Sequence, residues 1–140
     1  MAQLAFQHTH RVTYADCTMG DHVYYANYLR LLEAARNEFF RHLGLPFLAL
    51  QNQDALFPVV ECHLRFKTAA RYDELLAIEV WPTLAERVRL NLSYRILNPA
   101  GGVVLEAETH HACTTIGGKP KRLPEDLRAK LPPFLRGTPD

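Results

Sequence analysis

The chain has 140 residues, 22% of them charged, a formal net charge of +1 and three cysteines without paired spacing. This length predicts a single domain, residues 1–140, that buries one hydrophobic core without disulfides or metals. The near-neutral charge, the odd cysteine count and the lack of a long apolar run exclude chain-wide attraction to nucleic acid, a disulfide framework and membrane insertion, and they favour the cytoplasm.

The first predicted element is a strand, and a long helix follows it. Over residues 4–14 the side chains alternate between two faces, which is the period of a β-strand. Over about residues 24–43 the period becomes that of a helix, and its apolar stripe contains Tyr28, Leu31, Leu32, Ala35, Phe39 and Leu43. Gly44 and Pro46 predict the end of this helix.

Four further strands are predicted in the rest of the chain. Alternating apolar and polar side chains mark residues 60–67, 76–80 and 88–96, and the last strand runs from residue 103 to about 116. An NPAGG turn joins the last two strands. Near the end, PEDLRAKL predicts a short helix that opens at Pro124, and the following LPPFLRG and GTPD predict a loosely held tail.

The order of these elements predicts the fold class. A strand, one long helix and four strands joined mainly by short turns indicate an antiparallel sheet with the helix packed on one face, an α+β arrangement. The stripe of the helix is wide and rich in Leu and Phe. A five-stranded sheet curled around the helix would bury that stripe best.

One segment resembles a known family. The match spans residues 12–45 within HRVTYADCTMGDHVYYANYLRLLEAARNEFFRHLGL, and it is strongest at VYYANYLRLLEAAR. This segment resembles the hotdog-fold acyl-CoA thioesterases of the 4-hydroxybenzoyl-CoA thioesterase type. The resemblance implies a sheet wrapped around one helix, a homodimer or homotetramer whose sheets join edge to edge, and active sites at the subunit interface. It also implies hydrolysis of an acyl-CoA substrate to free acid and coenzyme A without a metal or cofactor.

The chemistry of a thioesterase gives a role to the start of the helix. A thioester carbonyl gains negative charge during attack, and unpaired backbone N–H groups at a helix start stabilise that charge. We expect these amides near Tyr24 and Tyr25. A carboxylate on the preceding loop can act as nucleophile or as general base. Tyr25 stands where members of this family often have histidine, which changes the expected acid assistance.

The loop before the helix departs from the family pattern. Relatives commonly carry Asp-x-Asp with a catalytic second acid, whereas this chain has Asp16, Cys17 and Thr18, so that Thr18 takes the reactive position. Threonine can bind water or substrate but does not act as a carboxylate base. We therefore expect Asp16 to carry the carboxylate role, with His22 as a helper and Asp21 as the competing carboxylate.

Each of these residues also has a structural interpretation. A loop aspartate such as Asp16 commonly accepts hydrogen bonds from backbone amides in a turn, and Asp21 and His22 suit a solvated loop or a helix end. Nothing in the sequence activates Cys17, which suits packing better than nucleophilic attack. Glu33 faces away from the apolar stripe, where it can reach an interface or form a surface ion pair.

Residues for substrate binding are assigned more weakly. Asn27 either contacts substrate or fixes the helix start, and Arg65 and Lys67 can meet coenzyme A phosphates or lie solvated at a sheet edge. His8 and His10, like the adjacent pair at residues 110–111, resemble parts of a metal site but lack the further ligands. We therefore expect no metal.

Two other functions remain open at this point. One is another acyl-thioester enzyme of the same fold, such as a hydratase, which needs a different arrangement of acid and base. The other is a non-catalytic acyl-CoA-binding protein, which the missing second acid favours. Release of free thiol, a change in acyl unsaturation, and saturable binding without turnover distinguish the three functions.

Overall fold

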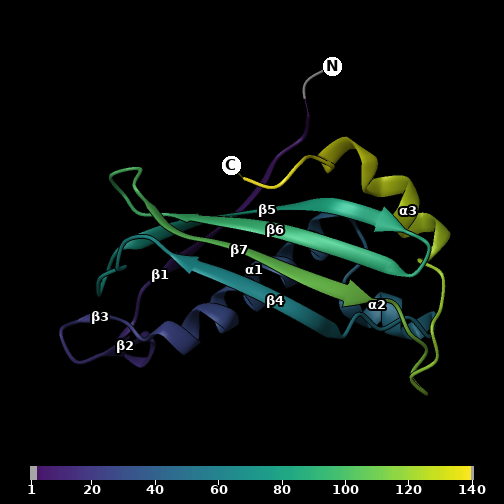
Figure 1. The fold of residues 1–140 in the computed structure, drawn as a ribbon, viewed down its shortest axis with the longest axis horizontal. Helices are drawn as coiled ribbons and strands as arrows, with labels where there is room; N and C mark the ends of the chain where they lie inside the picture. The colour runs from purple at the N-terminus through teal and green to yellow at the C-terminus, as the bar shows by residue number, and fades with distance from the viewer. Residues whose placement is uncertain (1–2, 140) are drawn as a thin grey trace.

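The computed structural model describes residues 3–139, which form a five-stranded antiparallel sheet, one long helix and two short helices at one end (Figure 1). In spatial order the strands are β1 (Phe6–Arg11), β5 (Leu75–Glu86), β6 (Arg89–Leu97), β7 (Val103–Ala112) and β4 (Val59–Phe66). A separate hairpin pairs β2 (Cys17–Thr18) with β3 (His22–Val23). The helices are α1 (Tyr28–His42), α2 (Phe47–Asn52) and α3 (Glu125–Lys130), with 3-10 turns η1 (Tyr14–Asp16), η2 (Tyr25–Asn27) and η3 (Pro132–Phe134).

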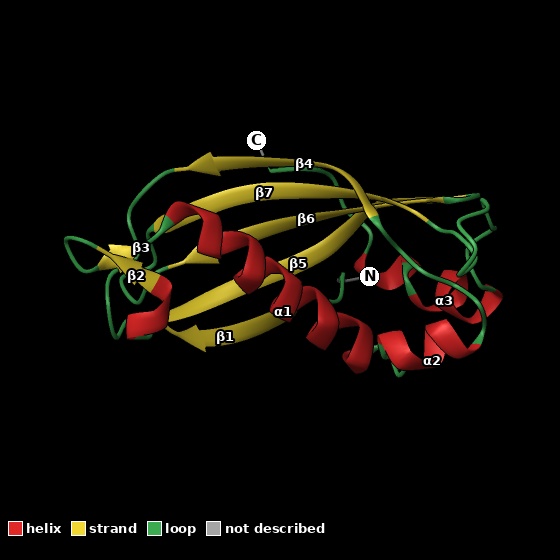
Figure 2. Ribbon diagram, turned by 90° about the horizontal axis from the view of Figure 1, so that it is seen from below, coloured by secondary structure: helices red, strands yellow, loops and turns green. Residues whose placement is uncertain are grey.

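The predicted fold class is confirmed. The long helix α1 crosses one face of the large sheet obliquely (Figure 2). All four pairs of neighbouring strands in that sheet are antiparallel. The chain therefore has the α+β hotdog architecture, a sheet wrapped around one helix.

Burial of one face of α1 explains why these residues form a helix here. All six residues of the predicted stripe are buried, with exposed fractions of at most 5%. They share one core with inward residues of β5 and β6, including Ile78 and Tyr94. Each large apolar side chain buried in this way contributes about 1.5–3 kcal/mol. The free energy of folding therefore depends on the match between helix and sheet.

The end of α1 is fixed by backbone hydrogen bonds. Leu45 N–H donates to the Phe40 carbonyl at 3.0 Å, and Gly44 N–H donates to the Arg41 carbonyl at 2.9 Å. Gly44 has φ +79°, a left-handed conformation that glycine adopts without a Cβ clash. This is a Schellman motif, and it confirms the predicted stop at Gly44.

Several element boundaries differ from the predictions. The α-helix begins at Tyr28 rather than near residue 24, because residues 25–27 form the tighter turn η2. The turn η1 and the β2–β3 hairpin replace the expected plain loop. Helix α2 was not predicted, and β7 ends at Ala112 rather than 116 because the chain there leaves the sheet to pair with Leu56.

The predicted loose tail is wrong for residues 131–137, which pack on the rest of the fold, and Asp140 lies outside the described residues. Phe134 is 4% exposed and packs on Phe39 with ring centroids 5.3 Å apart. Trp81 donates its indole N–H to the Gly137 carbonyl at 2.9 Å, and the Arg136 guanidinium lies 3.8 Å from the centre of the Trp81 ring. The tail covers a tryptophan on the outer sheet face, and this burial and cation–π contact hold it in place.

The strand β4 lies at one edge of the sheet and is largely exposed. It pairs with β7 alone within the described chain, and exposed apolar side chains occur at Val59, Val60 and Phe66. An edge strand with exposed apolar side chains is a site for pairing with another chain. None of the helices formed by residues 3–139 has the length and apolar character needed to cross a membrane.

Phe39 provides a test of the core. Its ring is fully buried and contacts the rings of Phe6, Phe40 and Phe134, so Phe39→Ala opens a cavity where β1, α1 and the tail meet. We expect the free energy of unfolding to fall by about 3–5 kcal/mol in urea titrations. Leu48→Ala, at a side chain that is 68% exposed, should change it by less than about 0.5 kcal/mol. A loss at Phe39 no larger than that of the control would contradict this account of the core.

Candidate active site

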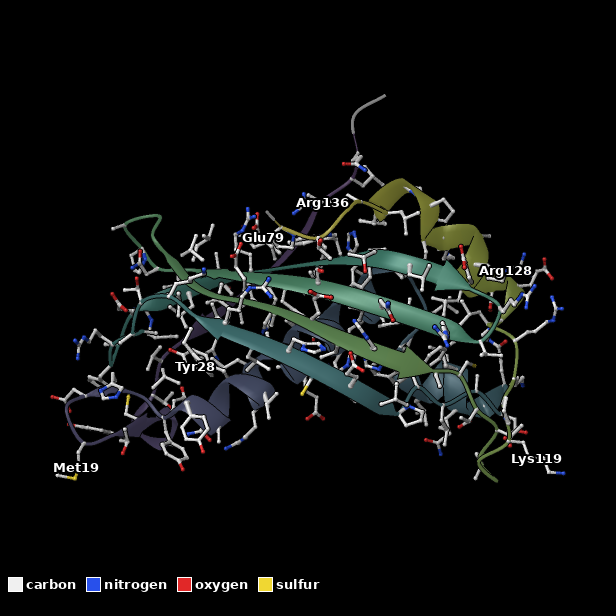
Figure 3. All side chains as sticks on the ribbon, in the orientation of Figure 1. Met19, Tyr28, Glu79, Lys119, Arg128 and Arg136 are labelled. Atoms are coloured by element: carbon white, nitrogen blue, oxygen red, sulfur yellow. The ribbon has the colours of Figure 1, made fainter. Side chains whose placement is uncertain are left out.

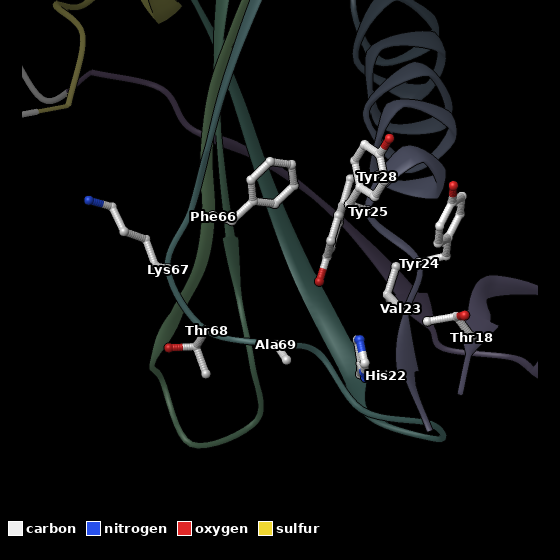
Figure 4. Close-up of a pocket in the computed structure, with 10 residues that line it drawn as sticks. All are labelled: Thr18, His22, Val23, Tyr24, Tyr25, Tyr28, Phe66, Lys67, Thr68 and Ala69. Carbon is white, nitrogen blue, oxygen red and sulfur yellow. The ribbon is translucent and has the colours of Figure 1, made fainter. Parts of the chain in front are cut away.

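A hollow of about 450 Å³ lies at the start of α1 (Figure 4). The β2–β3 hairpin, the turn η2, the first turn of α1 and the end of β4 form its walls. Its lining residues are Thr18, His22, Val23, Tyr24, Tyr25, Tyr28, Phe66, Lys67, Thr68 and Ala69. Five residues predicted for the site, Thr18, His22, Tyr24, Tyr25 and Lys67, are thus brought together, whereas Asp16, Asn27 and Arg65 are not among the lining residues.

The hairpin pairs Thr18 with His22 at the edge of the hollow. Thr18 and His22 are direct partners in the antiparallel register of β2 and β3. Directly opposed residues of an antiparallel pair project to the same face, about 5 Å apart at Cβ. Both side chains line the hollow. This pair is therefore the polar part of a site whose other walls are mostly aromatic.

The turn between these strands depends on Gly20. Asp21 N–H donates to the Thr18 carbonyl at 3.2 Å, and Gly20 has φ +88°. A Cβ at Gly20 would lie 3.3 Å from Nδ1 of His22, closer than ordinary packing allows. Glycine thus gives the backbone its left-handed conformation and leaves room for the imidazole ring.

Of the two amides expected at the helix start, only that of Tyr25 lacks a backbone acceptor among residues 3–139. Tyr24 N–H is engaged, because it donates to the Asp16 carbonyl at 2.9 Å. Asn27 N–H donates to the Tyr24 carbonyl at 2.8 Å, which closes the first turn. The Tyr25 amide begins η2, and in a helix the first N–H groups have no intrahelical acceptor. Of the two expected amides, Tyr25 is therefore the one that can meet a carbonyl oxygen.

The carboxylate of Asp16 contacts Thr13 and His10, and Asp16 is not among the residues that line the hollow. Its Oδ2 accepts hydrogen bonds from the Thr13 amide at 2.8 Å and the Thr13 hydroxyl at 3.1 Å, and it lies 2.7 Å from Nε2 of His10. Burial opposes ionisation, but the hydrogen bonds from Thr13 and His10 outweigh it and hold the pKa of Asp16 below 3.8. These contacts suit an ionised carboxylate that fixes the loop.

The backbone and neighbours of Asp16 join that loop to the helix. The Asp16 carbonyl accepts from the Asn27 side-chain amide at 3.0 Å as well as from Tyr24 N–H. Asn27 thus fixes the helix start, which was one of its two interpretations. Asp21 lies exposed in the hairpin turn with φ +59°. No sequence pattern predicted the pairing of His10 with Asp16, which requires β1 and η1 to meet in space.

The basic candidates lie toward the outer face of the sheet. Arg65 faces Glu106 in the register of β4 and β7. Lys67 lines the hollow with part of its chain, but in Figure 4 its ammonium extends away, and it lies 4.0 Å from a Glu106 carboxylate oxygen. Neither cation therefore points into the hollow.

The aromatic side chains that line one side of the hollow were not predicted from the sequence. Tyr28 and Phe66 lie with ring centroids 5.8 Å apart, and the Tyr25 ring lies 6.3 Å from Phe66. The Tyr28 hydroxyl accepts from Ala70 N–H at 3.3 Å, and burial raises the pKa of that phenol. The helical stripe predicted that Tyr28 is buried, but no sequence pattern predicted its contact with Phe66.

The histidines once considered for a metal have other neighbours. His111 donates from Nδ1 to the Phe57 carbonyl at 2.9 Å, its Nε2 lies 2.8 Å from the Thr109 hydroxyl, and burial lowers its pKa to about 4. His110 lies between Glu61 and Glu108 at 3.3 and 3.2 Å. Across residues 3–139, no group of three or more His, Cys, Asp or Glu side chains is arranged to hold a metal ion. Independence from metal stays a prediction.

Comparison with known proteins identifies the family. A family model described as the thioesterase-like superfamily matches residues 12–131. The acyl-CoA thioester hydrolase YbgC of Escherichia coli O157:H7 is 31% identical over 122 residues, covering 86% of this chain and 91% of YbgC. A solved structure, hypothetical protein TT1821 from Thermus thermophilus, is 30% identical with a TM-score of 0.85 over 91% of this chain and 98% of its own. The likeness to that structure therefore extends over nearly the whole of both chains. Slr0204, a 1,4-dihydroxy-2-naphthoyl-CoA thioesterase from Synechocystis, shares the fold at 22% identity, with a TM-score of 0.84 over 91% of this chain and 95% of that one. The chain therefore belongs to the thioesterase-like superfamily.

Proposed function

We propose that this protein is an acyl-CoA thioesterase, which hydrolyses an acyl-CoA thioester to a free acid and coenzyme A. The observation that carries the proposal is that Tyr25, the first residue of η2, lines the same hollow as the Thr18–His22 pair. The name of the relative YbgC, an acyl-CoA thioester hydrolase, supports the same substrate class. The hollow combines apolar walls for an acyl group with polar groups for its carbonyl.

The geometry supports a direct attack by water. The carbonyl oxygen of the thioester accepts a hydrogen bond from Tyr25 N–H, where the positive end of the helix stabilises the developing charge. The Thr18 hydroxyl and the His22 imidazole hold the attacking water, and His22 accepts its proton. Collapse of the tetrahedral intermediate breaks the C–S bond, and the imidazolium returns the proton to the leaving thiolate.

Asp16 has a supporting role in this proposal. Its carboxylate is 2.7 Å from His10 and holds the Thr13 turn, so it keeps the hairpin and helix start in register. The catalytic role expected from the sequence stays a prediction for Asp16, and Tyr24 contributes its ring to the hollow while its amide is engaged. Variants of His22 and Asp16 distinguish the two assignments.

A hydratase and a non-catalytic binder remain the alternatives. A hydratase needs an acid and a base placed on a carbon–carbon double bond, and the polar side chains lining the hollow are two threonines, one histidine, one lysine and three tyrosines, without a carboxylate. A binder needs no base. Thiol release from acyl-CoA would exclude the binder, and formation of a hydroxyacyl product would favour the hydratase.

We infer that the working form is a homodimer, or a homotetramer built from it, joined through β4. This edge strand exposes Val59, Val60 and Phe66, with exposed fractions of 45%, 65% and 52%. Pairing of two β4 edges would satisfy the unpaired backbone groups and cover these side chains. Because Phe66 also lines the hollow, the partner would lie beside the site.

The cysteines support a reducing compartment such as the cytoplasm. Cys17, Cys62 and Cys113 are all free thiols. Burial raises the pKa of the Cys113 thiol, which keeps it protonated and unreactive. No disulfide contributes to this fold among the described residues.

The first activity test compares His22→Gln with Asp16→Asn. Loss of the imidazole base should lower kcat for thiol release from acyl-CoA by at least about a hundredfold. Asp16→Asn should lower it by less than about tenfold, because the carboxylate lies outside the hollow. Thr18→Val should fall between them. A folded, inactive Asp16→Asn beside an active His22→Gln would return the base role to Asp16.

The second test follows the ionisation of Asp16. Because its folded-state pKa lies below the ordinary value of 3.8, its stabilising effect is complete above that value and is lost as the pH falls through the lowered pKa. At neutral pH, Asp16→Asn should lower the free energy of unfolding by about 1.5–3 kcal/mol. The difference from wild type should narrow in denaturant titrations below about pH 4.

Asp21→Asn is the matched control for that titration. Asp21 is exposed, and asparagine tolerates its left-handed backbone as well as aspartate does. Its stability should follow that of the wild type at each pH. A loss at Asp16→Asn that stays constant through acid pH would show that the carboxylate charge does not stabilise the loop.

The third test concerns assembly. Sedimentation at micromolar concentration should give at least a dimer, and Val60→Lys should shift the protein toward monomer because it places a charge on the exposed edge of β4. Leu48→Lys, at an exposed position of α2, is the control and should leave assembly unchanged. A wild-type protein that sediments only as monomer would exclude the edge-to-edge dimer.

A further inference from the structure

A line of hydrogen bonds links α1 to the segment that precedes β4. The Arg36 guanidinium donates to the Tyr94 hydroxyl at 3.1 Å, and that hydroxyl lies 2.6 Å from the Thr109 hydroxyl. Thr109 lies 2.8 Å from Nε2 of His111, and Nδ1 of that ring lies 2.9 Å from the Phe57 carbonyl oxygen. Tyr94, Thr109 and His111 are buried, so each of these contacts satisfies a polar group inside the core.

One direction of donation satisfies every member of the line. Burial lowers the pKa of His111 to about 4, so at neutral pH the ring is neutral and carries one N–H. The Phe57 carbonyl can only accept, so that N–H is on Nδ1, and Nε2 accepts from Thr109. Thr109 then accepts from Tyr94, whose oxygen accepts from Arg36. The line is therefore complete without a carboxylate.

This line holds Arg36 in place and leaves its charge unpaired. A guanidinium has five N–H donors, and the described hydrogen bonds engage one of its nitrogens with a neutral phenol. Within residues 3–139, no carboxylate lies within ion-pair distance of Arg36, although its side chain is half-buried. A guanidinium that is fixed and partly removed from water is suited to bind a carboxylate through two parallel hydrogen bonds.

Both ends of the line border one hollow of about 220 Å³, which lies between α1, α2 and residues 55–57. Figure 2 shows α2 beside the end of α1. The lining residues are Glu33, Arg36, Asn37, Phe47, Gln51, Ala55, Leu56 and Phe57. Arg36 begins the line and the Phe57 carbonyl ends it, so the same hydrogen bonds fix a cation and an aromatic residue at this hollow.

The other lining residues supply amide groups and aromatic walls. Asn37 is half-buried on α1, and Gln51 is exposed on α2. Their side-chain amides can donate to an anion held at the guanidinium. Phe47 and Phe57 both pack on Phe40, with ring centroids 4.7 and 6.0 Å from that ring. The hollow therefore combines one cation and neutral donors with fixed apolar walls, a combination that suits an acid with an apolar body.

We propose that this hollow binds a small monocarboxylic acid, with the carboxylate held by Arg36 and the apolar body against Phe47 and Phe57. Arg36 is the one cation among the lining residues, so a second acid group on the ligand would lack a partner. The hollow shares no lining residue with the one at the start of α1. It is therefore a separate binding site, and it does not depend on the proposed thioesterase function.

Glu33 weakens the binding of an anion at this site. It lines the hollow, but it is exposed, and its carboxylate is not within ion-pair distance of Arg36 among the described contacts. A solvated carboxylate repels a bound carboxylate weakly, because water and salt screen the charges. Glu33→Gln should therefore lower the Kd of the acid by about twofold, the opposite of removing the charge of Arg36.

Benzoate and benzamide test the site, because they have the same size and differ in charge. Millimolar benzoate should shift the amide NMR signals of residues 55–57 and of α2 in the full-length wild type. We expect a Kd of roughly 1 mM, a value suited to a ligand of this size. Benzamide should bind at least about tenfold more weakly, because it lacks the charge that pairs with the guanidinium.

Variants then locate the carboxylate. Arg36→Met should raise the Kd of benzoate at least about tenfold, and Arg36→Lys should raise it less, because lysine keeps the charge but lacks the planar fork. Gln51→Glu, at an exposed position, should raise it about fivefold, because it places a carboxylate beside the guanidinium. Arg41→Met is the control, at an exposed arginine of α1 that does not line the hollow, and it should leave the Kd unchanged.

Each other outcome overturns the proposal. Equal affinity for benzoate and benzamide would show that the charge of Arg36 plays no part. Shifts confined to the β2–β3 hairpin would place the acid in the candidate active site instead. An absence of shifts in the wild type, with a changed sedimentation coefficient in Arg36→Met, would show that a carboxylate of a second copy occupies Arg36. If thermal melts show that Arg36→Met does not fold, Gln51→Glu decides, and an unchanged Kd in that variant would overturn the site.

Discussion

The burial of one face of α1 against the sheet is the constraint on which the rest of the structure depends. Six side chains of that face have exposed fractions of 5% or less, and together they fill the space between the helix and strands β5 and β6. A helix held along its whole length cannot rotate or slide without exposing apolar surface. Its first turn is therefore fixed at one end of the sheet, where the hairpin and the end of β4 complete a hollow. Figure 3 shows Tyr28 at this end, while Lys119 and Arg128 lie at the opposite end.

The same burial imposes conditions on polar groups inside the core. Tyr94 and Thr109 face inward from β6 and β7, where an unpaired hydroxyl would cost about 1–3 kcal/mol. The line from Arg36 to the Phe57 carbonyl satisfies them and joins α1 to two strands and to the loop before β4. Breaking it at one point leaves a buried partner unsatisfied, so the position of Arg36 is coupled to the packing of the core.

The periodic helix and strands of this structure could be predicted from the sequence, whereas most contacts between distant segments could not. A helix period of 3.6 and a strand period of 2 follow from burial of one face, so the stripe ending at Leu43 and the strand around Tyr94 could be predicted locally. The pairing of His10 with Asp16 could not, because it depends on where η1 meets β1. The prediction for the tail failed for the same reason. A proline-rich composition suggested a loosely held segment, but Trp81, which is distant in the sequence, contacts Arg136 and Gly137 and holds the tail.

The register of the β2–β3 hairpin bears on the departure from the family pattern at Thr18. A carboxylate at this position would project from β2 into the hollow, and threonine keeps the position polar but removes the base. In an antiparallel pair, the residue directly across the ladder projects to the same face, and here that residue is His22. In the proposed mechanism, an imidazole at this place reaches the same water that a carboxylate at position 18 would reach, and its free ring nitrogen accepts the proton. Gly20 makes the exchange sterically possible, since any Cβ there would press on the ring. The aspartate two residues earlier is then left to hold the loop, and its contacts with Thr13 and His10 are those of a carboxylate bound by its neighbours rather than one waiting for substrate.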